Sequence, residues 1–142
     1  MVQIDIAYEG DLRCRARHGP SGTELLTDPP VDNQGRGAYF SPTDLVATAL
    51  GTCMLTTMAI VARRHGWDLS GARVRVEKGM VADPARRIGR LAVVIAVPAE
   101  LDDAARAALE RTAHACPVHK SLAPTTEIPV TFLWGAAARL PA

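Results

Sequence analysis

The chain has 142 residues, of which 48% are hydrophobic and 22% are charged. This is the composition of an ordinary globular protein and excludes a disordered chain, so we expect a single domain spanning residues 1–142 with a hydrophobic core of its own. The formal net charge is only +1, and charges of both signs are spread along the chain. Neither a nucleic acid nor a membrane surface is therefore expected as a partner.

The first 40 residues predict strands followed by a long loop. Apolar residues alternate with polar or small ones from Val2 to Tyr8 and again from Leu12 to Ala16, which predicts a hairpin of two half-buried strands. Residues 23–27 are long enough for a third strand. Residues 28–40 are rich in Pro, Gly, Asn and Asp, so we expect a loop, and loops of this length in small domains tend to carry function.

A long helix is predicted from Ser41 to Gly66. Ser41 provides an N-cap, Pro42 suits the first helical position, and basic residues precede Gly66 at the end. No charged residue lies between Asp44 and Arg63, so the helix is apolar around most of its circumference and must be covered on most sides. A chain of this size has few elements with which to cover it, which predicts an obligate homodimer.

The same helix reaches the lower length limit of a membrane span. Four threonines interrupt its apolar stretch, and the segments around it predict strands that need a core, so we interpret it as a core helix. Residues 1–10 start without a positive charge and carry an Asp within their apolar alternation, which is not the pattern of a signal peptide. The sequence therefore predicts a cytoplasmic protein.

The second half of the chain predicts a strand hairpin, helical segments and a last strand. Residues 72–78 alternate strictly, and residues 88–97 form a dense apolar run that suggests a strand buried on both faces. An apolar stripe predicts a helix over residues 101–115, which ends before Pro117, where a short helical turn begins. Residues 128–134 predict the last strand. This order predicts an α+β fold, with a long buried central helix and a second helix on an antiparallel sheet.

The three cysteines, Cys14, Cys53 and Cys116, lack the dense spacing of a disulfide scaffold, which leaves structural, metal-binding and redox roles open. Cys116 precedes Pro117 at the expected N-cap of a helical turn, where backbone amides and the helix dipole lower the pKa of a thiol. Cys53 lies mid-helix, so a reactive thiolate there needs a cation from elsewhere, and the upstream loop offers Arg36. The alternative is that both cysteines are ordinary core residues.

Two segments around these cysteines resemble a known family. The run Pro-Thr-Asp-Leu-Val-Ala-Thr-Ala-Leu-Gly-Thr-Cys53-Met is followed later in the chain by a helix ending in Ala-Cys116-Pro-Val. Both resemble the OsmC and Ohr proteins, the osmotically induced protein and organic hydroperoxide resistance group, and the similarity covers nearly the whole chain. The resemblance implies an intertwined homodimer in which two long central helices pack together, and it identifies the chain as a divergent, general OsmC-like member.

The resemblance also implies a reaction. Cys53 matches the attacking, peroxidatic cysteine and Cys116 the resolving one, so the Cys53 thiolate would attack an organic hydroperoxide and the resulting sulfenic acid would condense with Cys116. Arg36 is our choice for the active-site arginine, with Arg13 and Arg15 as reserves. A dithiol reductant would restore the thiols, and neither a cofactor nor a metal is implied. The expected function is a thiol-dependent peroxidase that protects against oxidative or osmotic stress.

One position departs from the family pattern. The peroxidase members carry a glutamate ten residues before the helix cysteine, where this chain has Thr43, with Asp44 one residue along. A shift of one residue turns a helical side chain by about 100°, so Asp44 is not equivalent to that glutamate.

Two other functions therefore stay open. One is a non-catalytic OsmC-like dimer that binds a small apolar ligand in the same cleft. The other is a metal site, for which His114, Cys116 and His119 offer three ligands within six residues and Cys53 a fourth.

Overall fold

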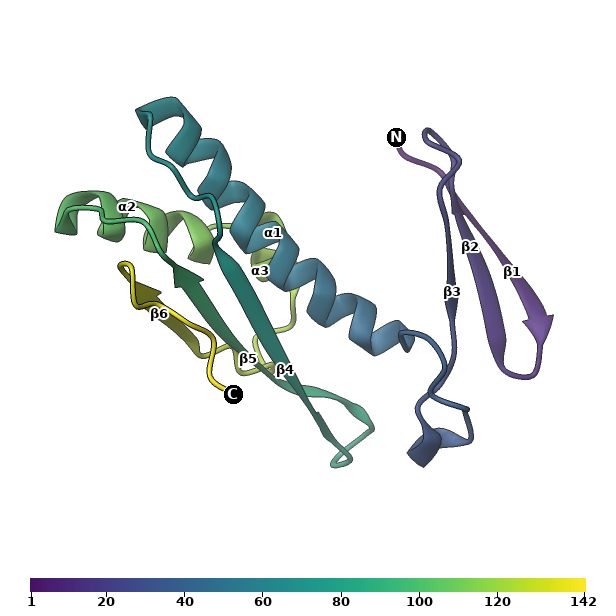
Figure 1. Cartoon of the computed structure of the whole chain (residues 1–142). Coiled ribbons are helices and arrows are strands. Elements are labelled where there is room, and N and C mark those ends of the chain that lie inside the picture. Colours follow the sequence, from purple (N-terminus) through teal and green to yellow (C-terminus); the bar gives the residue numbers. More distant parts are fainter. The chain divides into compact units, whose positions relative to one another are not determined.

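The computed structural model describes residues 1–142, which form two compact units, Met1–Val46 and Ala47–Ala142 (Figure 1). We call them the N-terminal unit and the C-terminal unit. The boundary between them falls in the first turns of the long helix α1, Pro42–His65.

Three antiparallel strands make the sheet of the N-terminal unit, in agreement with the predicted hairpin and third strand. They are β1, Ile4–Gly10; β2, Arg13–His18; and β3, Glu24–Thr27. The register pairs Ile6 with Ala16 and Ala16 with Leu25, so the apolar residues of all three strands share one face. This face follows directly from the alternation in the sequence, because successive side chains of a strand point to opposite sides.

The loop between β3 and α1 is organised around one buried carboxylate. Asp28 is fully buried and accepts the backbone N–H groups of Ala38 at 2.9 Å and Arg36 at 3.4 Å. The loop contains a short 3-10 helix, η1, Val31–Asn33. A Cβ atom on Gly35 would lie 1.7 Å from the carbonyl oxygen of Pro29, so only glycine fits this close approach of two backbone segments.

A second three-stranded sheet lies in the C-terminal unit, in the order β4-β5-β6. Its strands are β4, Arg73–Val81; β5, Arg87–Val97; and β6, Val130–Trp134. β4 and β5 form the predicted antiparallel hairpin, whereas β6 runs parallel to β5. The predicted sheet was antiparallel throughout, and β6 differs because the chain between β5 and β6 makes a crossover through two helices. These helices are α2, Asp103–His114, and α3, Pro117–Ser121.

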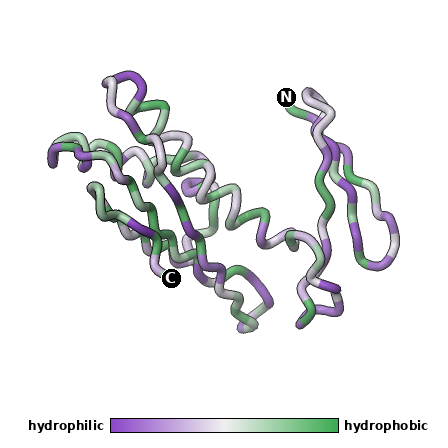
Figure 2. The backbone as a smooth tube through the Cα atoms, viewed as in Figure 1, coloured by the Kyte–Doolittle hydropathy of each residue, from purple (hydrophilic) through white to green (hydrophobic).

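The hydrophobic core of the C-terminal unit joins α1, β5 and α2. Leu50, Met54 and Met58 of α1 are fully buried, and Figure 2 shows that the hydrophilic stretch of this helix lies at its C-terminal end. A Cβ on Gly51 would lie 2.9 Å from Cγ2 of Val76, so glycine lets the helix approach β4 closely. On β5, alternate residues from Leu91 to Val97 are fully buried; the opposite face is only half-buried at Ala92 and Val94. The α+β fold class, with a long central helix and a second helix, is thus confirmed.

By length and composition, α1 is also apolar enough to cross a membrane. The same properties occur in core helices of globular proteins. Because the three large residues on its inner face are fully buried within the unit, we interpret α1 as a core helix.

Candidate functional site: a pair of thiols

The start of α1 is fixed by a reciprocal cap. The hydroxyl of Ser41 accepts the backbone N–H of Asp44 at 3.2 Å, and the Asp44 carboxylate accepts the backbone N–H of Ser41 at 2.8 Å. This capping box satisfies two backbone donors and sets the register of the helix. Leu50 and Met54 lie on the buried face of α1, and the helical period places Cys53 at the edge of that face.

The carboxylate of Asp44 therefore has a structural role at the helix terminus. Thr43, at the position of the family glutamate, has its hydroxyl 3.1 Å from that of Ser41. Ser41 and Asp44 thus cap α1, and the hydroxyl of Thr43 lies beside the capping hydroxyl of Ser41.

Cys116 occupies the N-cap of α3, as the sequence predicts. Its Sγ accepts the backbone N–H of His119 at 3.3 Å, and Pro117 stands at the first helical position, where the missing N–H costs nothing. The backbone N–H of Cys116 donates to Ala113 at 3.2 Å and its carbonyl accepts from Lys120 at 3.1 Å. The backbone on both sides of the thiol is therefore held by α2 and α3.

The fold places the thiol of Cys53 next to that of Cys116, close enough for each to influence the titration of the other. Both are free thiols. Burial raises the pKa of Cys116, the backbone N–H of His119 opposes that shift, and the neighbouring Cys53 raises the pKa further. The expectation that the helical cap lowers this pKa is therefore wrong in its net direction, because desolvation of the thiolate outweighs one capping N–H.

The two sulfurs differ in accessibility. Cys116 has 0% of its surface exposed and belongs to the buried core cluster, whereas Cys53 is partly exposed and packs against the edge of that cluster. An exposed thiol beside a buried one is an arrangement in which the first can meet a solute and the second can react only with the first.

Cys14 does not belong to the same unit as Cys53 and Cys116. It belongs to β2 of the N-terminal unit, where its register partners are Tyr8 and Thr27.

The arginines considered from the sequence all lie in the N-terminal unit. Arg36 is exposed and forms an ion pair with Asp11 at 3.2 Å. Arg15 is held between Glu9 and Glu24, and these hydrogen bonds raise its pKa. Arg13 was the other alternative to Arg36. Its guanidinium lies over the ring of Tyr39, 5.6 Å from the ring centre, which is the distance of a cation–π contact.

Asp28 is the residue that the sequence analysis missed. The pKa of the Asp28 carboxyl is lowered, and the hydrogen bond from the N–H of Ala38 is the main cause. The N–H of Arg36 and the charges of Arg13 and Arg36 lower the pKa further, while burial opposes the shift. The carboxylate thereby orients the loop segment that carries Arg36. The Asp-Pro-Pro run at the end of a strand was the available signal, because Asp commonly accepts backbone N–H groups in turns.

The proposed metal ligands do not form a site. The rings of His114 and His119 meet edge to face, with centres 5.8 Å apart, and burial lowers the pKa of His119. Across residues 1–142 no three His, Cys, Asp or Glu side chains are placed so that they could hold a metal ion. The geometry contradicts the metal-site alternative, because a structural zinc site needs four converging ligands.

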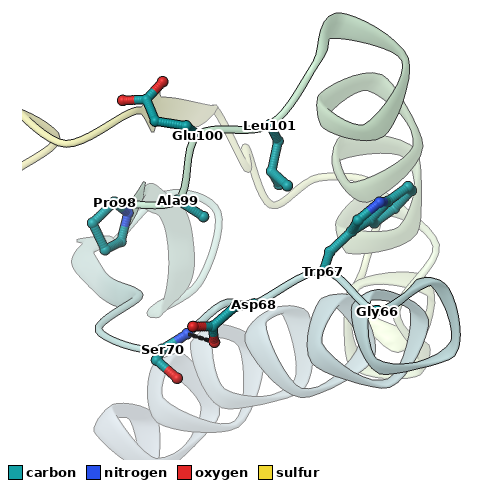
Figure 3. Close-up of a pocket in the computed structure, with 8 residues that line it drawn as sticks. All are labelled: Gly66, Trp67, Asp68, Ser70, Pro98, Ala99, Glu100 and Leu101. Atoms are coloured by element: carbon teal, nitrogen blue, oxygen red, sulfur yellow. Dashed lines mark hydrogen bonds between the residues drawn. The ribbon is translucent and has the colours of Figure 1, made fainter.

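A cavity of about 580 Å³ lies elsewhere in the C-terminal unit, between the segment after α1 and the segment after β5 (Figure 3). No cysteine lines it. Its two carboxylates already have partners, because Asp68 accepts the N–H of Ser70 and Glu100 accepts the N–H of Ala136, both at 2.8 Å. The cavity is therefore separate from the thiol pair.

Comparison with known proteins places this geometry in a family. The sequence matches the OsmC-like protein family over residues 35–131, while no curated protein matches the chain. A crystal structure from Psychrobacter arcticus, of a protein provisionally named an osmotic stress induced and detoxification response protein, shares 45% identity, with a TM-score of 0.88 over 93% of this chain and 96% of that one.

More distant structures share the fold. An organic hydroperoxide resistance protein OsmC from Legionella pneumophila has 18% identity and a TM-score of 0.73, over 94% of this chain and 96% of that one. An OsmC-like protein from Mycoplasma pneumoniae has 14% identity and a TM-score of 0.80, over 95% and 97%. With a family match over most of its length and a relative at 45% identity, this chain belongs to the OsmC-like protein family.

Proposed function

We propose that the protein is a cytoplasmic thiol-dependent peroxidase that reduces organic hydroperoxides and so protects against oxidative or osmotic stress. The observation that carries the proposal is the contact between the partly exposed thiol of Cys53 and the buried thiol of Cys116. Membership of the OsmC-like family and the name of the Legionella protein, an organic hydroperoxide resistance protein, support the same chemistry.

The reaction has three steps. The thiolate of Cys53 attacks the terminal oxygen of the hydroperoxide, the O–O bond breaks, and the alcohol leaves after taking up a proton. Cys53 is then a sulfenic acid. The thiol of Cys116 condenses with it, forming a disulfide and releasing water. A dithiol reductant completes the cycle by reducing the disulfide, and no cofactor is required.

Arg36 is proposed to stabilise the Cys53 thiolate and to polarise the peroxide. Its present partner, Asp11, forms an ion pair in which both side chains are mostly exposed, and such pairs contribute little. The pair is therefore no obstacle to a second role of the guanidinium.

A homodimer and a single domain, residues 1–142, are part of the proposal. Large apolar residues of β1 stay exposed, among them Ile6 at 69% and Tyr8 at 67%, and a second copy is the natural cover for such a surface. The Psychrobacter structure matches 93% of this chain, so the match extends over both units and supports their treatment as one domain.

The alternative function is a non-catalytic dimer that binds a small apolar ligand. Thr43 favours it, because the family glutamate that braces the arginine is absent and the adjacent carboxylate of Asp44 caps α1.

Stopped-flow oxidation by cumene hydroperoxide separates these functions. We expect Cys53→Ser to abolish turnover, Cys116→Ser to leave the first oxidation intact and block disulfide formation, and Cys14→Ser, the matched control, to change neither. Arg36→Ala should slow the first step by about 10²-fold, as expected when a group that stabilises the developing charge is lost. A Cys53 that reacts no faster than a free thiol, and ignores Arg36, would favour ligand binding.

A further inference from the structure

The two sulfurs of the thiol pair differ in whether a reducing thiol can reach them. Cys116 is fully buried within the C-terminal unit, while Cys53 keeps part of its surface. The side chains that bury Cys116 belong to its own unit, so its burial does not depend on a partner chain. We propose, on the basis of the proposed function, that the reductant attacks the sulfur of Cys53 and that Cys116 is the leaving thiol.

The geometry of thiol–disulfide exchange supports this direction. The attacking sulfur must approach along the axis of the disulfide bond, from the side opposite the leaving sulfur. Approach to Cys116 would have to pass through the core cluster to which it belongs, together with Leu109 and Ala113, all with 0% exposed surface. Approach to Cys53 meets the edge of that cluster, where its side chain is partly open.

The bonds and electrons of the step balance. A thiolate of the dithiol reductant forms a bond to Sγ of Cys53, the bond between Cys53 and Cys116 breaks, and its electron pair leaves on Sγ of Cys116. The second thiolate of the reductant then attacks the reductant's own sulfur in the mixed disulfide and releases the Cys53 thiolate. The protein disulfide is reduced, and the dithiol is oxidised to a disulfide.

The N-terminus of α3 is arranged to receive the leaving sulfur. The backbone N–H of His119 donates to Sγ of Cys116 at 3.3 Å, and the N–H of Val118 also interacts favourably with the negative sulfur. These donors are already in place in the reduced protein, so they offset part of the cost that burial imposes on charge at Cys116.

Burial then helps to make the step one-way. Because burial raises the pKa of Cys116, the departed thiolate takes up a proton readily at neutral pH. A protonated thiol is a poor nucleophile, so Cys116 is slow to attack the mixed disulfide on Cys53 and regenerate the starting disulfide. The second thiol of the reductant has time to act.

The test uses the full chain with Cys14→Ser, oxidised by diamide so that peroxidase activity is not required. A brief reaction with 2-mercaptoethanol, a monothiol, is quenched with excess N-ethylmaleimide. The protein is then unfolded in the presence of that reagent, so that a buried thiol is also alkylated, and the peptides are mapped by mass spectrometry. We expect the mercaptoethanol adduct on Cys53 and the alkyl group on Cys116, in about tenfold or greater excess over the reverse labelling. Predominant adduct on Cys116, or equal labelling, would overturn the inference.

The same reaction in urea serves as the control. Unfolding exposes both sulfurs, so the selectivity should fall toward equal labelling, and a selectivity that persists in urea would contradict burial as its cause. A disulfide that forms with diamide but not with cumene hydroperoxide would overturn the proposed function and leave this test valid. Failure to form the Cys53–Cys116 disulfide with diamide would overturn the inference itself.

Discussion

The two units of the chain differ in how much of their apolar surface is buried. Every buried hydrophobic residue lies in the C-terminal unit, from Ala47 to Cys116, whereas the buried residues of the N-terminal unit are Thr27, Asp28 and Ser41. Both units contain a three-stranded sheet with an apolar face. The C-terminal unit contains α-helices that pack in one core with its sheet, whereas residues 1–41 form no α-helix and only the short 3-10 helix η1.

This difference indicates where stability comes from. An apolar face that stays exposed to water contributes no free energy of burial. The C-terminal unit therefore supplies most of the internal stability, and the thiol pair lies in it. The N-terminal sheet depends on a further surface, which we propose to be that of a second copy.

The largest effect should come from the core of the C-terminal unit. Leu50 is fully buried in α1, so Leu50→Ala should lower the free energy of unfolding by about 2–5 kcal/mol through lost burial and a residual cavity. Urea unfolding followed by circular dichroism measures this. Leu25→Ala on β3, where the leucine is 44% exposed, is the matched control in the other unit. Equal losses for the two variants would contradict the comparison.

The next effect tests the apolar face of the N-terminal sheet. If a second copy covers this face, Ile6→Lys should weaken the dimer by roughly 1.5–3 kcal/mol, the cost of losing one buried Ile. The neighbouring change Ala7→Lys, on the opposite face of the same strand, should have little effect. Sedimentation equilibrium over a range of concentrations gives both dissociation constants. A stable monomer for the unmodified protein would remove the dimer from the proposal.

The smallest effect concerns the loop around Asp28 and depends on pH. The folded-state pKa of Asp28 is lowered, first by the N–H of Ala38, so its contribution to stability is present above the unfolded value of about 3.9 and is lost as the pH falls through the lower folded value. The difference in unfolding midpoint between the unmodified protein and Asp28→Asn should therefore be largest above about pH 5 and shrink toward pH 3. A difference that is independent of pH would mean that the charge has no part in holding the loop.

Local features of the sequence determined most of the elements. The capping residues Ser41 and Asp44 and the basic end of α1 fix the helix within a residue or two, because these interactions are made between neighbours in the chain. The alternation in β1, β2 and β4 was equally informative, since the period of a strand shows directly in the order of its residues. The N-cap position of Cys116 could be read from Pro117 for the same reason.

Tertiary structure decided what depends on residues far apart in the chain. The parallel pairing of β6 with β5 and the contact between Cys53 and Cys116 both result from the crossover that lays α2 and α3 on the core. The pKa of Cys116 shows most clearly what local sequence cannot predict. The helical cap predicts a lower pKa, but burial raises the pKa, and the side chains that bury the thiol come from other elements. Desolvation depends on everything packed around a group, and no short stretch of sequence contains that information.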